Sequence, residues 1–207
     1  MTRAVLDSVA VDGTDSGIRR VPLTPEGYDR RWEELAATGA DIHGEADLVA
    51  SLLGAPEGRA VLDAGCGTGR VAVELARRGY ATVGVDVDPA LLDRARAKAP
   101  DLEWHEGDLS TLPEDVAPGP FAAAVLAGNV MIFVAPGTEE AVLDHVATRV
   151  ARGGLVVAGF QLTGRLPWEH YEALAARAGL EPVARWSTWQ RAPFTGRDYV
   201  VAVDSKR

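Results

Sequence analysis

An alternation of short apolar runs with segments of helical periodicity constrains the fold most, and it extends from residue 60 to residue 178. The apolar runs have the length of buried strands, and the segments between them place apolar residues three and four positions apart. The runs predict strands over residues 60–64, 81–86, 102–106, 121–127 and 155–160, and the segments predict helices over residues 68–78, 88–99, 138–151 and 167–178. Strands that alternate with helices form a parallel sheet that is covered on both faces.

Two more strand-like stretches follow the alternation, near residues 181–189 and 198–203, with no helix between them. Strands joined without a crossover helix form a hairpin, so one of the two must run antiparallel to the rest. The sequence therefore predicts an α/β fold with a doubly wound sheet of seven strands. The sheet is mostly parallel, it has one antiparallel strand in a C-terminal hairpin, and helices cover both of its faces.

The N-terminal region differs from this pattern. Residues 1–22 contain Gly13, Gly17 and Pro22 among scattered aspartates and show little periodicity, which predicts a flexible arm. Thr24-Pro25-Glu26 is typical of a helix start, with a hydroxyl cap, a proline in the first turn and an acid. Helices are expected over about residues 24–39 and 44–53, so a single domain should extend over residues 23–207.

The charge balance narrows the range of partners. The chain has 30 acidic and 21 basic residues, a net charge of −9, and only two lysines. Binding to nucleic acid or to anionic membrane is not expected without a basic patch. The single cysteine, Cys66, fits a reducing compartment. The N-terminus lacks the basic start and apolar core of a signal peptide, and no apolar span of about 18 residues occurs, so we expect a cytoplasmic protein.

The most informative segment follows the first strand of the alternation and reads Val-Leu-Asp-Ala-Gly-Cys-Gly-Thr-Gly over residues 61–69. Glycines there permit a sharp turn and a close approach of a ligand to the backbone. The helix that follows offers unpaired N–H groups. Asp86 ends the next strand, about 20 residues further on, where a carboxylate can bind ribose hydroxyls.

Two classes of nucleotide cofactor compete for this segment. The dinucleotide fingerprint G-x-G-x-x-G would place its third glycine at Arg70, so it fails. No tyrosine is followed four residues later by a lysine, the pair common in nicotinamide-dependent reductases. Asp63 stands two residues before the first glycine, and its charge would repel a pyrophosphate but attract an ammonium or sulfonium group. The sequence therefore favours a cationic ligand that carries a ribose.

The motif Asp63-Ala-Gly65-Cys-Gly67-Thr-Gly69 resembles that of the class I S-adenosylmethionine-dependent methyltransferases, whose hallmark is an acid followed by G-x-G-x-G. Four further segments continue the resemblance in the family's order: Gly84-Val-Asp86, Glu106-Gly107-Asp108-Leu109, Phe121 to Val130, and Arg152-Gly-Gly-Leu155. The match covers roughly residues 42–205. It implies a Rossmann-like fold, S-adenosyl-L-methionine as the cofactor and S-adenosyl-L-homocysteine as its product.

The resemblance also implies roles for individual residues. Asp86 would hold the ribose hydroxyls, Asp108 and the Leu109 backbone would contact adenine, and Asn129 would lie at the edge of the methyl-transfer site. The expected cofactor-binding set is Asp63, Gly65, Cys66, Gly67, Gly69, Asp86, Val87, Asp108, Leu109 and Asn129. Two of these residues have an alternative, structural role. Asp108 can be a loop acid or a helix cap, and Asn129 can be a turn residue. Cys66 is expected to be a small filler and not a nucleophile.

The sequence says less about the residues that bind the methyl acceptor than about those that bind the cofactor. The resemblance implies that the helices over residues 24–53 form a lid, and the expected substrate residues are Tyr28, Trp32, His43, Asn129 and Met131. His43 and His170 are candidate bases, although many members of the family need none. Arginine and tryptophan side chains near the C-terminus are further candidates for an aromatic or anionic acceptor, with surface packing as the alternative: Arg165, Trp168, Trp186, Trp189 and Arg191.

The residues around the end of the fourth strand argue against two classes of substrate. They read Asn-Val-Met-Ile over residues 129–132, and not the Asn-Pro-Pro-Tyr of enzymes that methylate adenine or glutamine nitrogen. Residues 126–128 carry no carboxylate for a hard cation, so no metal is expected. What remains is methyl transfer by in-line displacement to a small molecule, in a monomer or homodimer. The alternative is a non-catalytic module that binds the cofactor and acts through protein partners.

Overall fold

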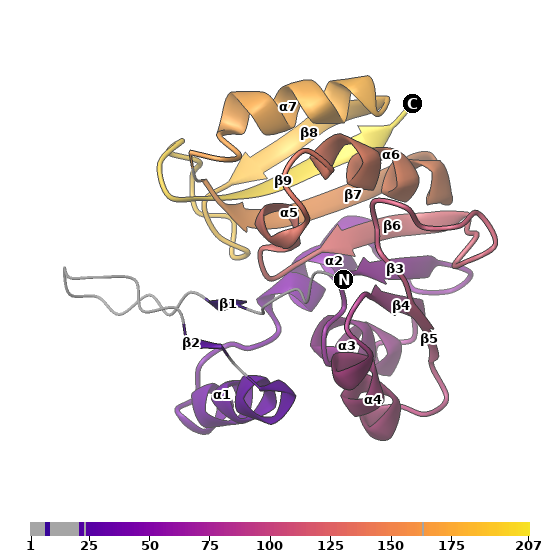
Figure 1. Cartoon of the computed structure of the whole chain (residues 1–207), viewed down its shortest axis with the longest axis vertical. Helices are drawn as coiled ribbons and strands as arrows, with labels where there is room; N and C mark the ends of the chain where they lie inside the picture. Colours follow the sequence, from indigo (N-terminus) through magenta and orange to yellow (C-terminus); the bar gives the residue numbers. More distant parts are fainter. Residues whose placement is uncertain (1–6, 9–20, 23, 163) are drawn as a thin grey trace. The chain divides into compact units, whose positions relative to one another are not determined.

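The computed structural model describes residues 7–8, 21–22, 24–162 and 164–207 (Figure 1). Contacts divide the chain into two compact units, Met1–Ile42 and His43–Arg207. The first unit contains the strands β1 (Asp7–Ser8) and β2 (Val21–Pro22) and the helix α1 (Pro25–Ala37). The second unit contains the helix α2 (Gly44–Leu53) and the whole predicted alternation.

In the first unit, β1 pairs antiparallel with β2. Apart from these two strands, the arm predicted over residues 1–22 lies outside the described residues. The helix start predicted at Thr24 is confirmed, because the Thr24 hydroxyl accepts a hydrogen bond from the Gly27 N–H at 3.1 Å and a proline occupies the first turn. The N-cap thereby satisfies one of the backbone donors that every helix leaves unpaired.

The second unit is built on a seven-stranded sheet with the strand order β5-β4-β3-β6-β7-β9-β8. Its strands are β3 (Ala60–Ala64), β4 (Ala81–Asp86), β5 (Glu103–Glu106), β6 (Phe121–Leu126), β7 (Val150–Gln161), β8 (Leu180–Trp186) and β9 (Tyr199–Lys206). The first five pair in parallel, while β9 lies antiparallel between β7 and β8. The predicted seven-stranded sheet with one antiparallel strand in a C-terminal hairpin is confirmed.

Helices cover both faces of this sheet. They are α3 (Arg70–Arg77), α4 (Pro89–Lys98), α5 (Val130–Phe133), α6 (Glu139–Arg149) and α7 (Trp168–Arg177), in addition to α2. Apolar residues of α2 and α3 form one core with the sheet, and those of α6 and α7 form a second core on the opposite face. Figure 1 shows α6 and α7 along the half of the sheet that contains β7, β8 and β9, and α3 and α4 beside β3, β4 and β5. The carboxyl ends of the parallel strands meet at one edge, which is where ligands bind in sheets of this kind.

Two local features differ from the sequence prediction. Helix α6 ends at Arg149, and β7 begins at Val150, five residues before the predicted strand start at Leu155. A register shift between Phe121 and Ala123 of β6 accommodates the extra residues, and Gly153 turns the chain there with a φ of 75°. The short helix α5 was not predicted, because four residues are too few for a periodic signal.

The helices of the structure can be compared with the length and apolar character that a membrane span requires. No helix in the described part of the chain has the length and apolar character needed to cross a bilayer.

Candidate functional site

The glycine turn between β3 and α3 forms the centre of the candidate site. Gly65, Gly67 and Gly69 all have left-handed backbone conformations, with φ values of 81°, 55° and 80°. Residues with a Cβ adopt this region only at a cost of about 1–2 kcal/mol. The turn is fixed to the neighbouring strand, because the N–H groups of Gly65 and Cys66 both donate to the carbonyl of Val85, at 2.8 and 3.0 Å.

Asp86 connects the glycine turn to the turn that follows β4. Its Oδ2 accepts a hydrogen bond from the Gly67 N–H at 2.7 Å, and its Oδ1 accepts one from the Asp88 N–H at 2.9 Å. The side chain is buried, and burial raises the pKa of its carboxyl. A carboxylate has about four lone-pair sites, so two backbone donors leave acceptor capacity for the hydroxyls of a ligand.

Asp63 lies deeper, below the turn. It is 2% exposed, and its Oδ2 accepts a hydrogen bond from the Ala72 N–H in the first turn of α3 at 3.0 Å. Burial raises the pKa of this carboxyl to about 7, while the Ala72 N–H and the Arg70 guanidinium act in the opposite direction. Asp63 therefore caps the helix after the turn and places a titratable group beneath it.

The position of Trp104 explains why two residues near the turn, Gly69 and Gly84, are glycines. Its ring lies so close to Gly69 and Gly84 that a Cβ at either position would overlap it. Its indole N–H donates to the Ala99 carbonyl at 2.9 Å, which fixes the ring in place. A Cβ at Gly67, in contrast, would meet no atom within 4 Å. Packing therefore requires the glycine at position 69, whereas the glycine at position 67 leaves the surface of the turn open to a ligand.

Cys66 lies in the middle of the turn with 8% exposure. Burial raises the pKa of its thiol, and the nearby carboxylates of Asp63 and Asp86 raise it further. A thiol is reactive as the thiolate, so this environment is that of an inert, space-filling cysteine.

The segment after β5 carries the residues expected to contact adenine. Oδ1 of Asp108 accepts hydrogen bonds from the backbone N–H and the hydroxyl of Ser110, at 2.8 and 2.7 Å, so this exposed acid caps its own turn. Leu109 is buried in the core. Val87, after β4, is 50% exposed and, in the part of the chain that the structure describes, is one of the few large apolar side chains that reach solvent. An exposed valine beside Asp86 is compatible with an apolar contact to a base.

Asn129 connects the ends of β6 and β7. Its N–H donates to the Gly159 carbonyl at 3.1 Å, and its side-chain Oδ1 accepts from the Gln161 N–H at 2.8 Å. Its φ of 71° makes it a turn residue, which is one of the two alternatives left open by the sequence, and its role at the methyl-transfer site stays a prediction. The next residue, Val130, lies so close to Gly65 that a Cβ there would overlap its side chain. The start of α5 therefore borders the glycine turn.

An ion pair joins α2 to the same turn. The guanidinium of Arg70, the first residue of α3, donates to both oxygens of Glu45, at 2.9 and 2.5 Å. The side chains of both residues are nearly buried, with 11% and 10% exposure. His43 precedes α2, and its Nδ1 lies 3.9 Å from Oε2 of Glu74. The sequence reasoning missed Glu45, and an acid in the first turn of a helix carries no signal that would single it out.

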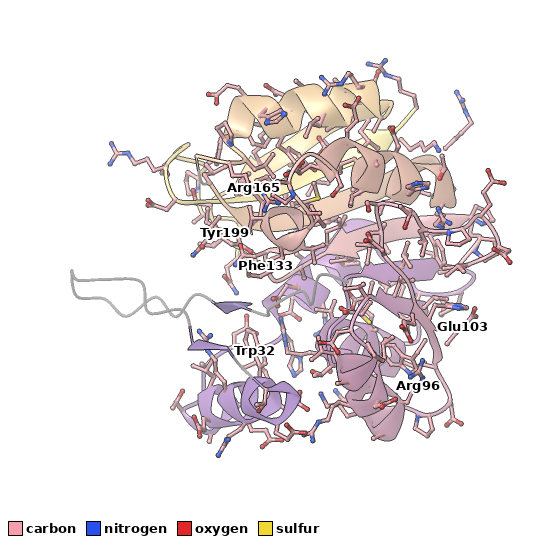
Figure 2. All side chains as sticks on the ribbon, in the orientation of Figure 1. Trp32, Arg96, Glu103, Phe133, Arg165 and Tyr199 are labelled. Carbon is pink, nitrogen blue, oxygen red and sulfur yellow. The ribbon has the colours of Figure 1, made fainter. Side chains whose placement is uncertain are left out.

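Other expected site residues lie elsewhere. Met131 is fully buried in the core, and a substrate role for its side chain stays a prediction. His170 is exposed on α7, beside the ion pair in which a hydrogen bond from Arg177 lowers the pKa of Glu140 on α6. Trp32 belongs to the first unit, whose placement relative to the second is not determined (Figure 2). The same holds for Tyr28, so the role of α1 as a lid stays a prediction.

Four of the five C-terminal candidates for acceptor binding have structural partners. Arg165 donates to Glu139 and to the Val134 carbonyl. The guanidinium of Arg185 lies 4.3 Å from the ring centroid of Trp168, and that of Arg191 lies 5.3 Å from the ring centroid of Trp186. Surface packing, the alternative left open by the sequence, accounts for these four. The fifth, Trp189, has a different environment, because its ring and the Tyr199 hydroxyl both lie over Gly159.

The described residues show no gathering of three or more histidine, cysteine or acidic side chains that a metal ion would need. What the site does bring together is a glycine turn, two buried carboxylates and an exposed apolar residue at the carboxyl ends of β3 and β4. The set lies at the edge of the sheet where α/β proteins of the Rossmann-like class bind their ligands.

Comparison with known proteins identifies the family within this class. Residues 61–154 match the model of a methyltransferase domain. A TehB-like S-adenosylmethionine-dependent methyltransferase from Corynebacterium glutamicum is 38% identical, with a TM-score of 0.80 over 88% of this chain and 98% of that one. A demethylmenaquinone methyltransferase from Beutenbergia cavernae is 34% identical over 84% of this chain and 67% of its own length. The chain belongs to the S-adenosylmethionine-dependent methyltransferases of the class I fold.

Other relatives match over a shorter part. A magnesium-protoporphyrin O-methyltransferase from Rhodobacter capsulatus is 41% identical over 37% of this chain, and the match spans 34% of that relative's length. The chain thus spans about a third of the length of that curated relative.

Proposed function

We propose that this chain binds S-adenosyl-L-methionine in the turn between β3 and α3 and transfers its methyl group to a small-molecule acceptor. When bound, the cofactor supplies a methyl group on a sulfonium, which an acceptor atom displaces in line with release of S-adenosyl-L-homocysteine. The observation that carries the proposal is the pair of hydrogen bonds from the Gly67 and Asp88 N–H groups to Asp86. They hold a carboxylate with spare acceptor capacity beside a turn whose outer surface is open at Gly67.

Each residue of the turn has a distinct task in this proposal. Asp86 accepts hydrogen bonds from the ribose hydroxyls, and Val87 and the Leu109 backbone border the adenine. Gly65, Cys66, Gly67 and Gly69 bring the backbone close to the ligand. Asp63, when ionised, provides negative potential below the positive end of the cofactor. Asp108 stabilises the turn that presents Leu109.

The acceptor side lies at the ends of β6 and β7. Asn129 borders it through its bonds to Gly159 and Gln161. His43 remains the candidate base, because it stands at the start of α2, on the side of the sheet where Arg70 meets Glu45. In this reaction the protein mainly orients the acceptor and excludes water, since the leaving group is already activated. We propose further that the protein is cytoplasmic, that it is a monomer or homodimer, and that its reaction needs no metal.

The test is formation of S-adenosyl-L-homocysteine from S-adenosyl-L-methionine in the presence of a small-metabolite fraction. We expect product with the wild-type protein and much less with Asp86→Ala at limiting cofactor. Binding of S-adenosyl-L-homocysteine without any turnover across such fractions would contradict the enzymatic reading and favour a non-catalytic binding module.

A further inference from the structure

A hollow lies at the edge of the sheet opposite to the glycine turn. It has a volume of about 390 Å³ and is formed by the end of α2, the start of β6, the segment before β3 and the turn near the beginning of β7. Arg59 immediately precedes β3, and Ala122 is the second residue of β6, so the hollow lies at the amino ends of these parallel strands. The five residues of β3 separate it from the glycine turn by roughly 16 Å.

The hollow is accessible from solvent. Arg59, Arg152 and Gly153 line it, and all three are exposed. A Cβ at Gly153 would meet no atom within 4 Å, whereas a Cβ at Gly154 would lie 2.9 Å from the carbonyl oxygen of Ala122. Gly154 is therefore required for packing against β6, and Gly153 leaves one side of the hollow free of any side chain.

Two guanidinium groups give the hollow its charge. Arg59 and Arg152 come from different segments, and none of the described residues that line the hollow is acidic. Within the described part of the chain neither side chain has an ion pair or a hydrogen bond, whereas the exposed Arg177 is paired with Glu140. In a chain with a net charge of −9, two such groups around one hollow concentrate positive potential there.

The rest of the wall is apolar. Leu52 and Leu53 from the end of α2, Ala122 from β6 and Leu155 from β7 line it, and they all belong to the core on the α2 side of the sheet. Leu53 is buried, while the other three are partly exposed. Covering this surface with an apolar group removes it from water, which an inorganic ion bound to the arginines alone would not do.

From this combination we propose that the hollow is a binding site for a small organic phosphate. A guanidinium can donate two parallel hydrogen bonds to phosphate oxygens, and two guanidiniums match the charge of a phosphate monoester, about −1.5 to −2 at pH 7. The organic group of the ligand lies against Leu52 and Leu155. The inference goes beyond the proposed function, because it holds whichever ligand the glycine turn binds.

The test uses phenyl phosphate as the probe, with inorganic phosphate and phenol as its two halves. Each is titrated calorimetrically into the ligand-free protein at low ionic strength, and we expect phenyl phosphate to bind saturably and more tightly than either half. Arg59→Gln and Arg152→Gln should each weaken phenyl phosphate by about five- to tenfold, because a charged donor is lost. Leu52→Ala should weaken phenyl phosphate and leave inorganic phosphate unchanged.

Arg197→Gln is the matched control. Arg197 is an exposed arginine between β8 and β9 that does not line the hollow, so its replacement should leave the affinity for phenyl phosphate unchanged. An equal loss in Arg197→Gln and Arg59→Gln would overturn the proposal, because the probe would then respond only to surface charge. Phenyl phosphate that fails to saturate, or that binds no more tightly than inorganic phosphate, would overturn it as well.

NMR spectra of the backbone amides locate the probe without any substitution. The signals of Gly153 and Gly154 should shift when phenyl phosphate is added, and those of Gly65 and Gly67 should not. Shifts confined to the glycine turn would place the probe at the other edge of the sheet and would contradict the assignment of the hollow.

Discussion

The Gly67 N–H donates a hydrogen bond to Oδ2 of Asp86 at 2.7 Å, across the gap between the turn after β3 and the end of β4. The other oxygen of the same carboxylate accepts from the Asp88 N–H. One side chain therefore sets the distance between the two loops that a nucleoside would touch. It does so without using all of its lone pairs, which leaves it able to bind ribose hydroxyls.

Asp86→Ala should weaken binding of S-adenosyl-L-homocysteine by about tenfold or more, because both the ribose contact and the fixed loop spacing are lost. Calorimetric titration measures the change. Asp93→Ala, an exposed aspartate on α4, serves as the control and should bind as the wild type does. Unchanged affinity in Asp86→Ala would contradict the ribose assignment.

Two glycine substitutions should separate binding from stability. Gly67→Val should abolish cofactor binding, because its side chain would extend into open space over the turn where the ligand is proposed to lie. The left-handed φ adds a stability cost of about 1–2 kcal/mol. Gly69→Ala should destabilise the fold more, because its Cβ would overlap the Trp104 ring. Thermal unfolding and titration distinguish the two, and retained binding in Gly67→Val would mean that the turn does not face the cofactor.

Asp63 should make the stability of the ligand-free protein depend on pH. The folded pKa of this carboxyl is about 7 against an ordinary 3.8, so the folded state retains a proton that the unfolded state has lost. Between these two values stability falls as pH rises, with a slope that approaches about 1.4 kcal/mol per pH unit for one such group.

Asp63→Asn removes this titration while its carbonyl can still accept from the Ala72 N–H. Denaturant unfolding at a series of pH values should therefore show a shallower fall for this variant than for the wild type. Asp204→Asn provides a comparison, because it removes a second buried carboxyl, whose pKa burial raises to about 6. Equal slopes in wild type and Asp63→Asn would show that Asp63 ionises normally in the folded protein.

The Cys66 thiol should be unreactive in the native protein. It is buried and its pKa is raised, so little thiolate is available to attack an electrophile. Mass spectrometry should find native protein unlabelled by iodoacetamide under conditions that label the denatured chain fully. Rapid labelling of the native state would mean that the turn opens to solvent.

The sequence contains enough local information to predict the elements of this fold. Helix starts at Thr24 and Asp88 were readable because their side chains cap the following turns, and both caps are present. The antiparallel strand followed from the missing helix between two strand-like stretches. The early start of β7 was not readable, since Val150 follows α6 directly and its strand character depends on pairing with Phe121 of a distant segment.

The sequence likewise predicts some residues of the candidate site and not others. The glycine turn, Asp63 and Asp86 belong to short motifs, so their neighbours in sequence are also their neighbours in space. Glu45 meets Arg70 beside the glycine turn through a tertiary contact from α2, and no local pattern marks it. Met131 follows the fourth strand and its side chain is fully buried in the core, so its expected substrate role stays a prediction.

The measurement that tests the account most directly is calorimetric titration of the purified protein with S-adenosyl-L-homocysteine, with NADH as the control. The account predicts saturable binding of S-adenosyl-L-homocysteine and none of NADH, because Asp63 disfavours a pyrophosphate at the turn and Asp86 favours a ribose beside it. Binding of NADH alone, or of neither compound, would contradict the assignment of this turn to S-adenosyl-L-methionine.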